Sequence, residues 1–185
     1  LNDVKARGML KCGSNTGLVG FAAPDDAGVW KGVDVDVCRA VAAAVFGDAN
    51  AMEVVPTTSK ARFTVLQSGE IDMLARNTTW TFSRDVDLGL EFVGVNYYDG
   101  QGFLVPASLG VSSALELDGA SVCIQVGTTT ELNLADFFRM HKMEYESIPV
   151  ETNDEADAAF LAGRCDVYTT DQSGLYAQRS TYPNP

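Results

Sequence analysis

The 185-residue sequence has little positive charge, a single histidine and no long hydrophobic run. Thirteen lysines and arginines stand against 25 aspartates and glutamates, a net charge of −12. Nucleic acid and anionic membrane surfaces are therefore poor partners, because both need basic patches. No run of about 18 apolar residues exists, so no segment is predicted to span a membrane. The first residues lack a basic start and an apolar stretch, so the signal peptide of an exported protein would already be gone.

Short motifs typical of several enzyme classes are also missing. The sequence contains no Gly-x-Ser-x-Gly, no His-Glu-x-x-His, no phosphate-binding Gly-x-x-x-x-Gly-Lys-Ser/Thr and no dinucleotide-binding glycine pattern. The one histidine, His141, is expected at the end of a helix, where an exposed cap is a simpler role than catalysis. The usual zinc spacings are absent as well. We therefore predict a protein that is not an enzyme and that uses no cofactor or metal.

The four cysteines, Cys12, Cys38, Cys123 and Cys165, form no Cys-x-x-Cys pair. They are either buried free thiols, which are common in protein cores, or two disulfides, which require an oxidising compartment. Four cysteines allow three connectivities. Pairing each with its neighbour along the chain gives Cys12–Cys38 and Cys123–Cys165.

Short apolar runs alternate with amphipathic stretches along most of the chain. Alternating strands and helices predict an α/β fold, with mostly parallel sheets and helices on their faces. A polar stretch at 106–113 indicates a boundary near 103–106, and thus a first lobe at 1–104 and a second at 105–185. Residues 17–30 are expected to form a loop or a wide hairpin. The predicted strands are 9–13, 52–56, 71–75, 121–125, 145–150 and 165–169, and the predicted helices are 34–46, 61–68, 83–88, 130–141, 154–162 and one that starts near Ser173.

Residues 66–72 and 160–166 share an internal echo: a helix end, a glycine, a charged residue, and then a strand that opens with an apolar residue and aspartate. Asn77 and Asp171 each follow their aspartate by five residues. The echo is either chance or the sign of two lobes of similar build. In the second case each lobe would present polar groups at the carboxyl ends of its strands, where open α/β sheets bind ligands.

Three polar positions after strands are candidate ligand contacts. Residues 127–131, Gly-Thr-Thr-Thr-Glu, open a helix and are consistent with an anion site, with a helix cap at Thr128, or with both. Arg84 is expected either to hold a carboxylate or to pair with a neighbouring aspartate. Asp171 is expected either to bind an ammonium group or to cap the last helix.

Taken together, residues 33–38, 66–72, 76–84, 96–102, 125–131 and 168–174 closely resemble the periplasmic solute-binding protein of general L-amino-acid ABC transporters, a group within bacterial extracellular solute-binding protein family 3. The resemblance covers essentially the whole chain. It implies a two-lobed fold of the type II periplasmic binding protein kind, in which each lobe is a mostly parallel sheet flanked by helices. It also favours the two disulfides between neighbouring cysteines.

The resemblance further implies a periplasmic protein that binds free L-amino acids and delivers them to the membrane permease of an ABC transporter. By motif, Arg84 would clamp the α-carboxylate and Asp171 would take the α-ammonium. The remaining ligand-binding residues would be Asn77, Thr79, Thr128, Thr129, Asn15, Leu18, Trp80 and Gln125.

The chain departs from this family at its end. Family members continue past the helix that contains Tyr176, so we expect a C-terminally truncated form in which both lobes are incomplete. Exposed apolar faces would then favour a homo-oligomer or a domain swap. One alternative is a module that has lost transport binding and acts by self-association. Another, less favoured, is a dehydratase-like enzyme on the same scaffold.

Overall fold

The computed structural model describes residues 1–183 and divides into two compact units, Leu1–Tyr98 and a second that begins at Asp99. This division falls before the predicted lobe boundary after residue 104. The difference arises because β6 (Gln101–Leu104) pairs antiparallel with β9 (Val167–Asp171) and so belongs to the second unit. Residues 184 and 185, the end of the predicted second lobe, lie outside the described residues.

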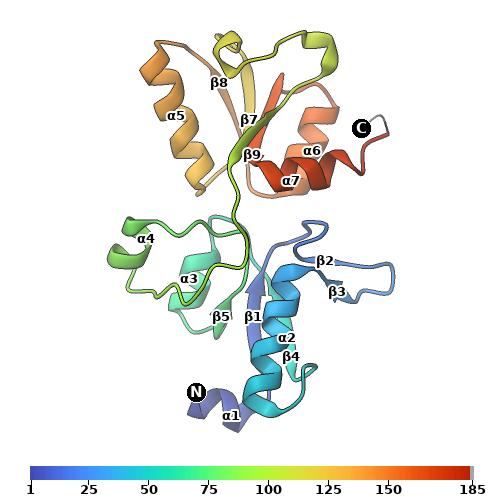
Figure 1. Ribbon diagram of the computed structural model, residues 1–185, viewed down its shortest axis with the longest axis vertical. Coiled ribbons are helices and arrows are strands. Elements are labelled where there is room, and N and C mark those ends of the chain that lie inside the picture. The colour runs from blue at the N-terminus through green and yellow to red at the C-terminus, as the bar shows by residue number, and fades with distance from the viewer. Residues whose placement is uncertain (184–185) are drawn as a thin grey trace. The chain divides into compact units, whose positions relative to one another are not determined.

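The first unit is built on a parallel sheet in the order β4–β1–β5 (Figure 1). These strands are Leu10–Ser14 (β1), Met52–Pro56 (β4) and Met73–Leu74 (β5). The predicted strand 71–75 is thus shorter than expected. Residues 17–30 lead into a small antiparallel hairpin formed by Ala23–Pro24 (β2) and Trp30–Lys31 (β3).

Helix α2 (Val33–Phe46) supplies much of the first unit's core and packs against β1 and β4. Its residues Val35, Cys38 and Ala42 are fully buried, a spacing that places them on one face of a helix. The helix ends at Gly47, which has a left-handed φ of 74°. The other helices of this unit are Asn2–Arg7 (α1), which the sequence pattern did not predict, Arg62–Gln67 (α3) and Phe82–Asp87 (α4).

The second unit contains a four-stranded sheet in the order β6–β9–β7–β8, in which only the β6–β9 pair is antiparallel. Strand β7 is Ser121–Gln125 and β8 is Glu146–Val150. Two short 3-10 turns, Ala107–Leu109 and Ala114–Glu116, precede β7. The sheet core is built from the segments predicted as strands, with β6 added at its edge.

Helices cover both faces of this second sheet (Figure 1). Val122 and Ile124 of β7 pack with α5 (Thr129–His141) in one core cluster. Cys123, the residue between them, packs in the opposite cluster with residues of α6 (Asn153–Leu161) and α7 (Gln172–Arg179). Successive strand residues point to opposite faces, so both faces of β7 are buried, as in other sheets with helices on each side.

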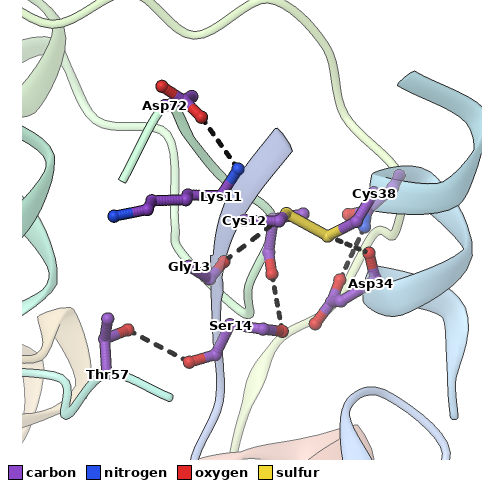
Figure 2. Close-up of a disulfide and its surroundings, with 10 residues drawn as sticks. Lys11, Cys12, Gly13, Ser14, Asp34, Cys38, Thr57 and Asp72 are labelled. Carbon is purple, nitrogen blue, oxygen red and sulfur yellow. Dashed lines mark hydrogen bonds between the residues drawn. A yellow bond between two sulfur atoms is a disulfide. The ribbon is translucent and has the colours of Figure 1, made fainter. Parts of the chain in front are cut away.

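Each unit contains one disulfide, and the predicted pairing is confirmed. Cys12–Cys38 joins β1 to α2 (Figure 2), and Cys123–Cys165 joins β7 to the segment before β9. The Cα–Cα distances are 6.0 and 5.7 Å, within the range that a disulfide spans. All four cysteines are 2% exposed or less, so both bridges lie inside the cores.

Within residues 1–183, no helix is long and apolar enough to cross a lipid bilayer.

Candidate functional site

In the first unit, polar side chains gather where the parallel strands end. Ser14 and Asn15 lie at the end of β1, Thr57 and Ser59 follow β4, and Asn77 follows β5. Ser14 donates to the carbonyl of Ala75 and Thr57 donates to the carbonyl of Ser14, at 2.8 and 3.0 Å. Because Ser14 and Thr57 are almost fully buried, their hydrogen bonds fix the three strand ends relative to one another.

Asn77 is the centre of this polar group. Its side-chain oxygen accepts hydrogen bonds from Arg76 Nη1 at 2.9 Å and from Asn15 Nδ2 at 3.0 Å. Its backbone carbonyl accepts a third from Arg62 Nη1 at 3.3 Å. Two arginines and Asn15, all 5% exposed or less, therefore surround one predicted ligand residue.

Arg84 lies in α4 and contacts residues of its own segment and Phe63 of α3. Its backbone N–H donates to the side chain of Thr81, which caps the helix, at 3.2 Å. Its guanidinium donates to the carbonyl of Thr79 at 2.9 Å and lies over the ring of Phe63, 5.1 Å from the centroid. Arg84 and Thr79, two predicted ligand residues, are thus direct neighbours.

Two further predicted residues of this unit are apolar. Trp80 is about half exposed and stacks on Phe92, with ring centroids 5.3 Å apart and planes 11° from parallel. Leu18 is only 2% exposed and forms an isolated backbone bridge with Ala22. Trp80 therefore presents an aromatic surface, whereas Leu18 serves mainly as a core residue of the loop after β1.

The predicted helix start at 127–131 lies at the carboxyl end of β7 in the second unit. The cap is confirmed, because the side chain of Thr128 accepts from Glu131 N–H at 3.1 Å and donates to the carbonyl of Gln125 at 2.7 Å. Glu131 in turn accepts from the N–H of Gly127 at 2.9 Å. The N–H groups that an anion would meet are therefore those of the first helical residues, which include Thr129.

Asp171 is the last residue of β9 and directly precedes α7. It lies at the N-cap position of α7, as the capping alternative expected, but its side chain makes no capping hydrogen bond to this helix. The backbone N–H of Ser173 instead donates to Asp99, at 3.2 Å, and the Ser173 hydroxyl donates to the same carboxylate. Asp99 has taken over the capping role that was expected of Asp171.

The ten predicted ligand residues thus form two groups, each inside one unit. Ser59, Arg62 and Arg76 were not predicted as site residues, yet they lie beside the predicted residues of the first unit. Arg76 could have been predicted, because it is a charged residue directly after the predicted strand 71–75 and next to Asn77. Among residues 1–183, no three histidine, cysteine, aspartate or glutamate side chains are placed to hold a metal ion. The first unit contributes Asn15, Leu18, Asn77, Thr79, Trp80 and Arg84, and the second contributes Gln125, Thr128, Thr129 and Asp171.

Sequence comparison finds close relatives along the whole chain. It is 61% identical over 185 residues to the general L-amino acid-binding periplasmic protein AapJ of Rhizobium johnstonii. It is 62% identical over 184 residues to the glutamate/glutamine/aspartate/asparagine-binding protein BztA of Rhodobacter capsulatus. The matches cover all of this chain and 54% of each relative, so the chain spans about half the length of the curated relatives it matches. Both relatives are named as binding proteins, not as enzymes.

A solved structure gives the same result for the fold. The ABC transporter periplasmic binding protein from Brucella ovis, with glutathione bound, superposes with a TM-score of 0.94 at 60% identity. The superposition covers all of this chain and 58% of that one. The parallel sheets flanked by helices are therefore those of the type II periplasmic binding proteins. Residues 10–162 also match the sequence profile described as bacterial extracellular solute-binding proteins, family 3, and the chain belongs to this family.

Proposed function

We propose that this chain binds free L-amino acids by recognising both charged ends of the zwitterion, for uptake by an ABC transporter. The observation that carries the proposal is the division of charge between the predicted ligand residues of the two units. The first unit contributes the guanidinium of Arg84, and the second contributes the carboxylate of Asp171. An amino acid with one anionic and one cationic group needs one partner of each sign.

Arg84 is the proposed partner of the α-carboxylate. A guanidinium presents its donors in a planar fork that matches the two oxygens of a carboxylate. The bond from Arg84 to the Thr79 carbonyl and the contact with the Phe63 ring hold this fork in one orientation. A side chain that is already ordered loses less conformational entropy when it binds, which favours affinity.

Asp171 is the proposed partner of the α-ammonium, together with the backbone carbonyl of Asn77. The Asn77 carbonyl already accepts a bond from Arg62, but a carbonyl oxygen has two lone pairs and can accept a second donor. The N–H groups at the start of α5, near Thr128 and Thr129, would complete the carboxylate site.

The names of the relatives support a broad choice of side chains. One is a general L-amino acid-binding protein and another is named for four acidic and amide amino acids. Gln125, Trp80, Asn15 and Leu18 are the residues that we expect to shape the side-chain part of the pocket. We further propose a periplasmic location and a transporter permease as the membrane partner, in keeping with two disulfides and periplasmic relatives.

Calorimetric titration of the ligand-stripped chain with single L-amino acids tests the proposal. We expect saturable binding that weakens by about 100-fold in Arg84→Ala and in Asp171→Ala, because each removes one partner of a charge-assisted pair. The matched controls are Arg39→Ala and Asp136→Ala, which break surface ion pairs in α2 and α5 and should leave affinity unchanged.

Absence of heat with every amino acid, in a folded and disulfide-bonded sample, would contradict the proposal. Light scattering on the same sample would then test the alternative of self-association. A stable oligomer that is unaffected by amino acids would support that alternative, and turnover of candidate substrates would support an enzyme instead.

A further inference from the structure

The side-chain amide of Asn77 is held in one orientation by its neighbours. Arg76 Nη1 lies 2.9 Å from Asn77 Oδ1. A guanidinium has five N–H donors and no acceptor, so the end of the amide that faces Arg76 must be the oxygen. The oxygen and nitrogen of an amide are usually assigned from such surroundings, and here the chemistry of arginine leaves one choice.

A second neighbour imposes the same orientation independently. The backbone N–H of Gly17, which can only donate, lies 3.1 Å from Asn15 Oδ1. The amide nitrogen of Asn15 therefore points the other way, and it lies 3.0 Å from Asn77 Oδ1. Both neighbours thus require the Asn77 oxygen to point toward them, and the donating nitrogen of Asn77 points away from both.

Arg76 also joins the loop after β4 to the loop after β5. Its Nε donates to the carbonyl of Thr57 at 3.3 Å, and its Nη2 donates to the hydroxyl of Ser59 at 3.0 Å. All three guanidinium nitrogens therefore have partners in the first unit, and the residue is 5% exposed. A buried arginine with this set of bonds is committed to positioning its neighbours, because removal of any partner leaves a buried donor unsatisfied.

We propose that Arg76 is a positioning residue of the ligand site, which fixes the amide orientation of Asn77 and the spacing between the loops that follow β4 and β5. The inference rests on the proposed function for its link to affinity. Its structural part concerns contacts inside the first unit alone and can be tested without a ligand.

The first test is hydrogen exchange of the ligand-free chain. In Arg76→Met, which keeps an unbranched apolar side chain but removes every donor, we expect amides in 57–59 and 77–79 to exchange about tenfold faster. Arg76→Lys should fall between Met and the native residue, since one ammonium cannot reach all three acceptors. Arg39→Met is the matched control, because Arg39 of α2 also donates to a carbonyl, that of Trp30 in β3, and within the described part of the chain has no bond to residues 57–59 or 77–79.

The second test is a double-mutant cycle on amino-acid affinity, with Arg76→Met and Asn77→Ala. If Arg76 acts through the Asn77 side chain, each variant weakens binding by about tenfold and the double variant by little more than either alone. Independent roles would instead multiply to about 100-fold. Arg39→Met should leave affinity unchanged, which separates positioning from a general loss of stability.

Exchange at 57–59 and 77–79 that is equal in native, Arg76→Met and Arg76→Lys chains would overturn the inference. Multiplicative losses in the affinity cycle would also overturn it. If the native chain binds no amino acid, the proposed function fails while the exchange result still decides the role of Arg76. If Arg76→Met does not fold, the comparison of Arg76→Lys with Arg39→Lys decides it in the same way.

Discussion

The two units contain the same turn motif at equivalent places. In each, a helix ends at a glycine of positive φ, Gly69 at 76° or Gly163 at 67°, and an aspartate follows three residues later. Asp72 accepts from the backbone N–H of Lys11 near the start of β1, at 2.8 Å. Asp166 accepts from the N–H of Ser121 at the start of β7, at 2.9 Å. The echo in the sequence therefore corresponds to one physical function, the anchoring of a central strand.

The units differ at the opposite ends of these strands. The first unit concentrates guanidinium groups there, from Arg62, Arg76 and Arg84. The second contributes hydroxyls at the start of α5 and the carboxylate of Asp171. The two units therefore share the aspartate bonds at the amino ends of their central strands, whereas the residues at the carboxyl ends have charges of different sign. Variants at the amino ends should therefore affect the two units equally, and they test the comparison most directly.

The largest expected effect comes from removing the disulfides. The bridges close loops of 26 and 42 residues, and the loop-closure entropy predicts losses of about 3.5 and about 4 kcal/mol in the free energy of unfolding. Urea denaturation of Cys12→Ala/Cys38→Ala and of Cys123→Ala/Cys165→Ala measures both. Both tryptophans, Trp30 and Trp80, belong to the first unit, so their fluorescence reports that unit alone. A fluorescence midpoint that moves equally in both variants would show that the units unfold as one.

A smaller loss of stability is expected from changing the two glycines of this shared turn motif. Gly69→Ala and Gly163→Ala force an L side chain into the left-handed region, at a cost of about 1–2 kcal/mol each. Neither new Cβ would meet another atom within 4 Å, so the backbone conformation is the whole cost and the two losses should match. Gly94→Ala is the control, because its φ is not positive and it also has open space. Unequal losses, measured by thermal or urea unfolding, would contradict the equivalence of the two turns.

Replacing either anchoring aspartate by alanine should lower the free energy of unfolding by about 1 kcal/mol, since both hydrogen bonds are partly accessible to water. Asp72→Ala also removes an ion pair with Arg7, and Asp166→Ala removes a bond from the Ser121 hydroxyl. Hydrogen exchange at Lys11 and Ser121 would locate the effect. Faster exchange at only one of these amides in its own variant would limit the shared role to that unit.

The smallest effect is the pH dependence that Asp157 gives to the stability of the second unit. Burial raises the pKa of Asp157 above its usual value of 3.8, and hydrogen bonds from Tyr182 and Gln178 oppose the shift only in part. The folded chain therefore binds this proton more tightly than the unfolded chain. The resulting stabilisation is fully present below pH 3.8 and is lost as the pH rises through the folded pKa.

Asp157→Asn should remove this dependence. Far-UV dichroism during urea unfolding, at pH 4 and at pH 7, should give a smaller difference between the two pH values for the variant than for the native chain. Tryptophan fluorescence follows the first unit, where burial also raises the pKa of Asp34, and its pH dependence should be the same in the variant and in the native chain. An unchanged difference in the variant would assign the pH dependence to other carboxylates.

Most of the second unit was predictable because its elements carry strong local signals. The predicted strand 121–125 has the observed bounds, and the predicted helix 154–162 is shifted by one residue at each end. The capping residues Thr128 and Thr152 mark where helices start, and both accept the bond expected of an N-cap. The pairing of the cysteines is the one that joins neighbours along the chain and that the family resemblance favoured.

The sequence pattern was less informative where long-range contacts decide the structure. Residues 101–104 were assigned to the first lobe, yet β6 pairs with β9, which lies more than sixty residues further along. Asp171 lies at the N-cap of α7, but the N–H of Ser173 donates to Asp99, which belongs to a distant segment. Arg76 bonds to Thr57 and Ser59 across the sheet. Local propensity carries no information about such partners, so these roles appear only in the fold.

The order of the cysteines has a consequence for how the chain matures. The first cysteine bonds to the second and the third to the fourth, so neither disulfide encloses or crosses the other. A chain that enters an oxidising compartment amino end first exposes Cys12 and Cys38 before Cys123 and Cys165 emerge. At that stage only one disulfide is available, and it is the native one. Correct oxidation therefore follows from the order of emergence, with less need for an isomerase to exchange wrongly paired bonds.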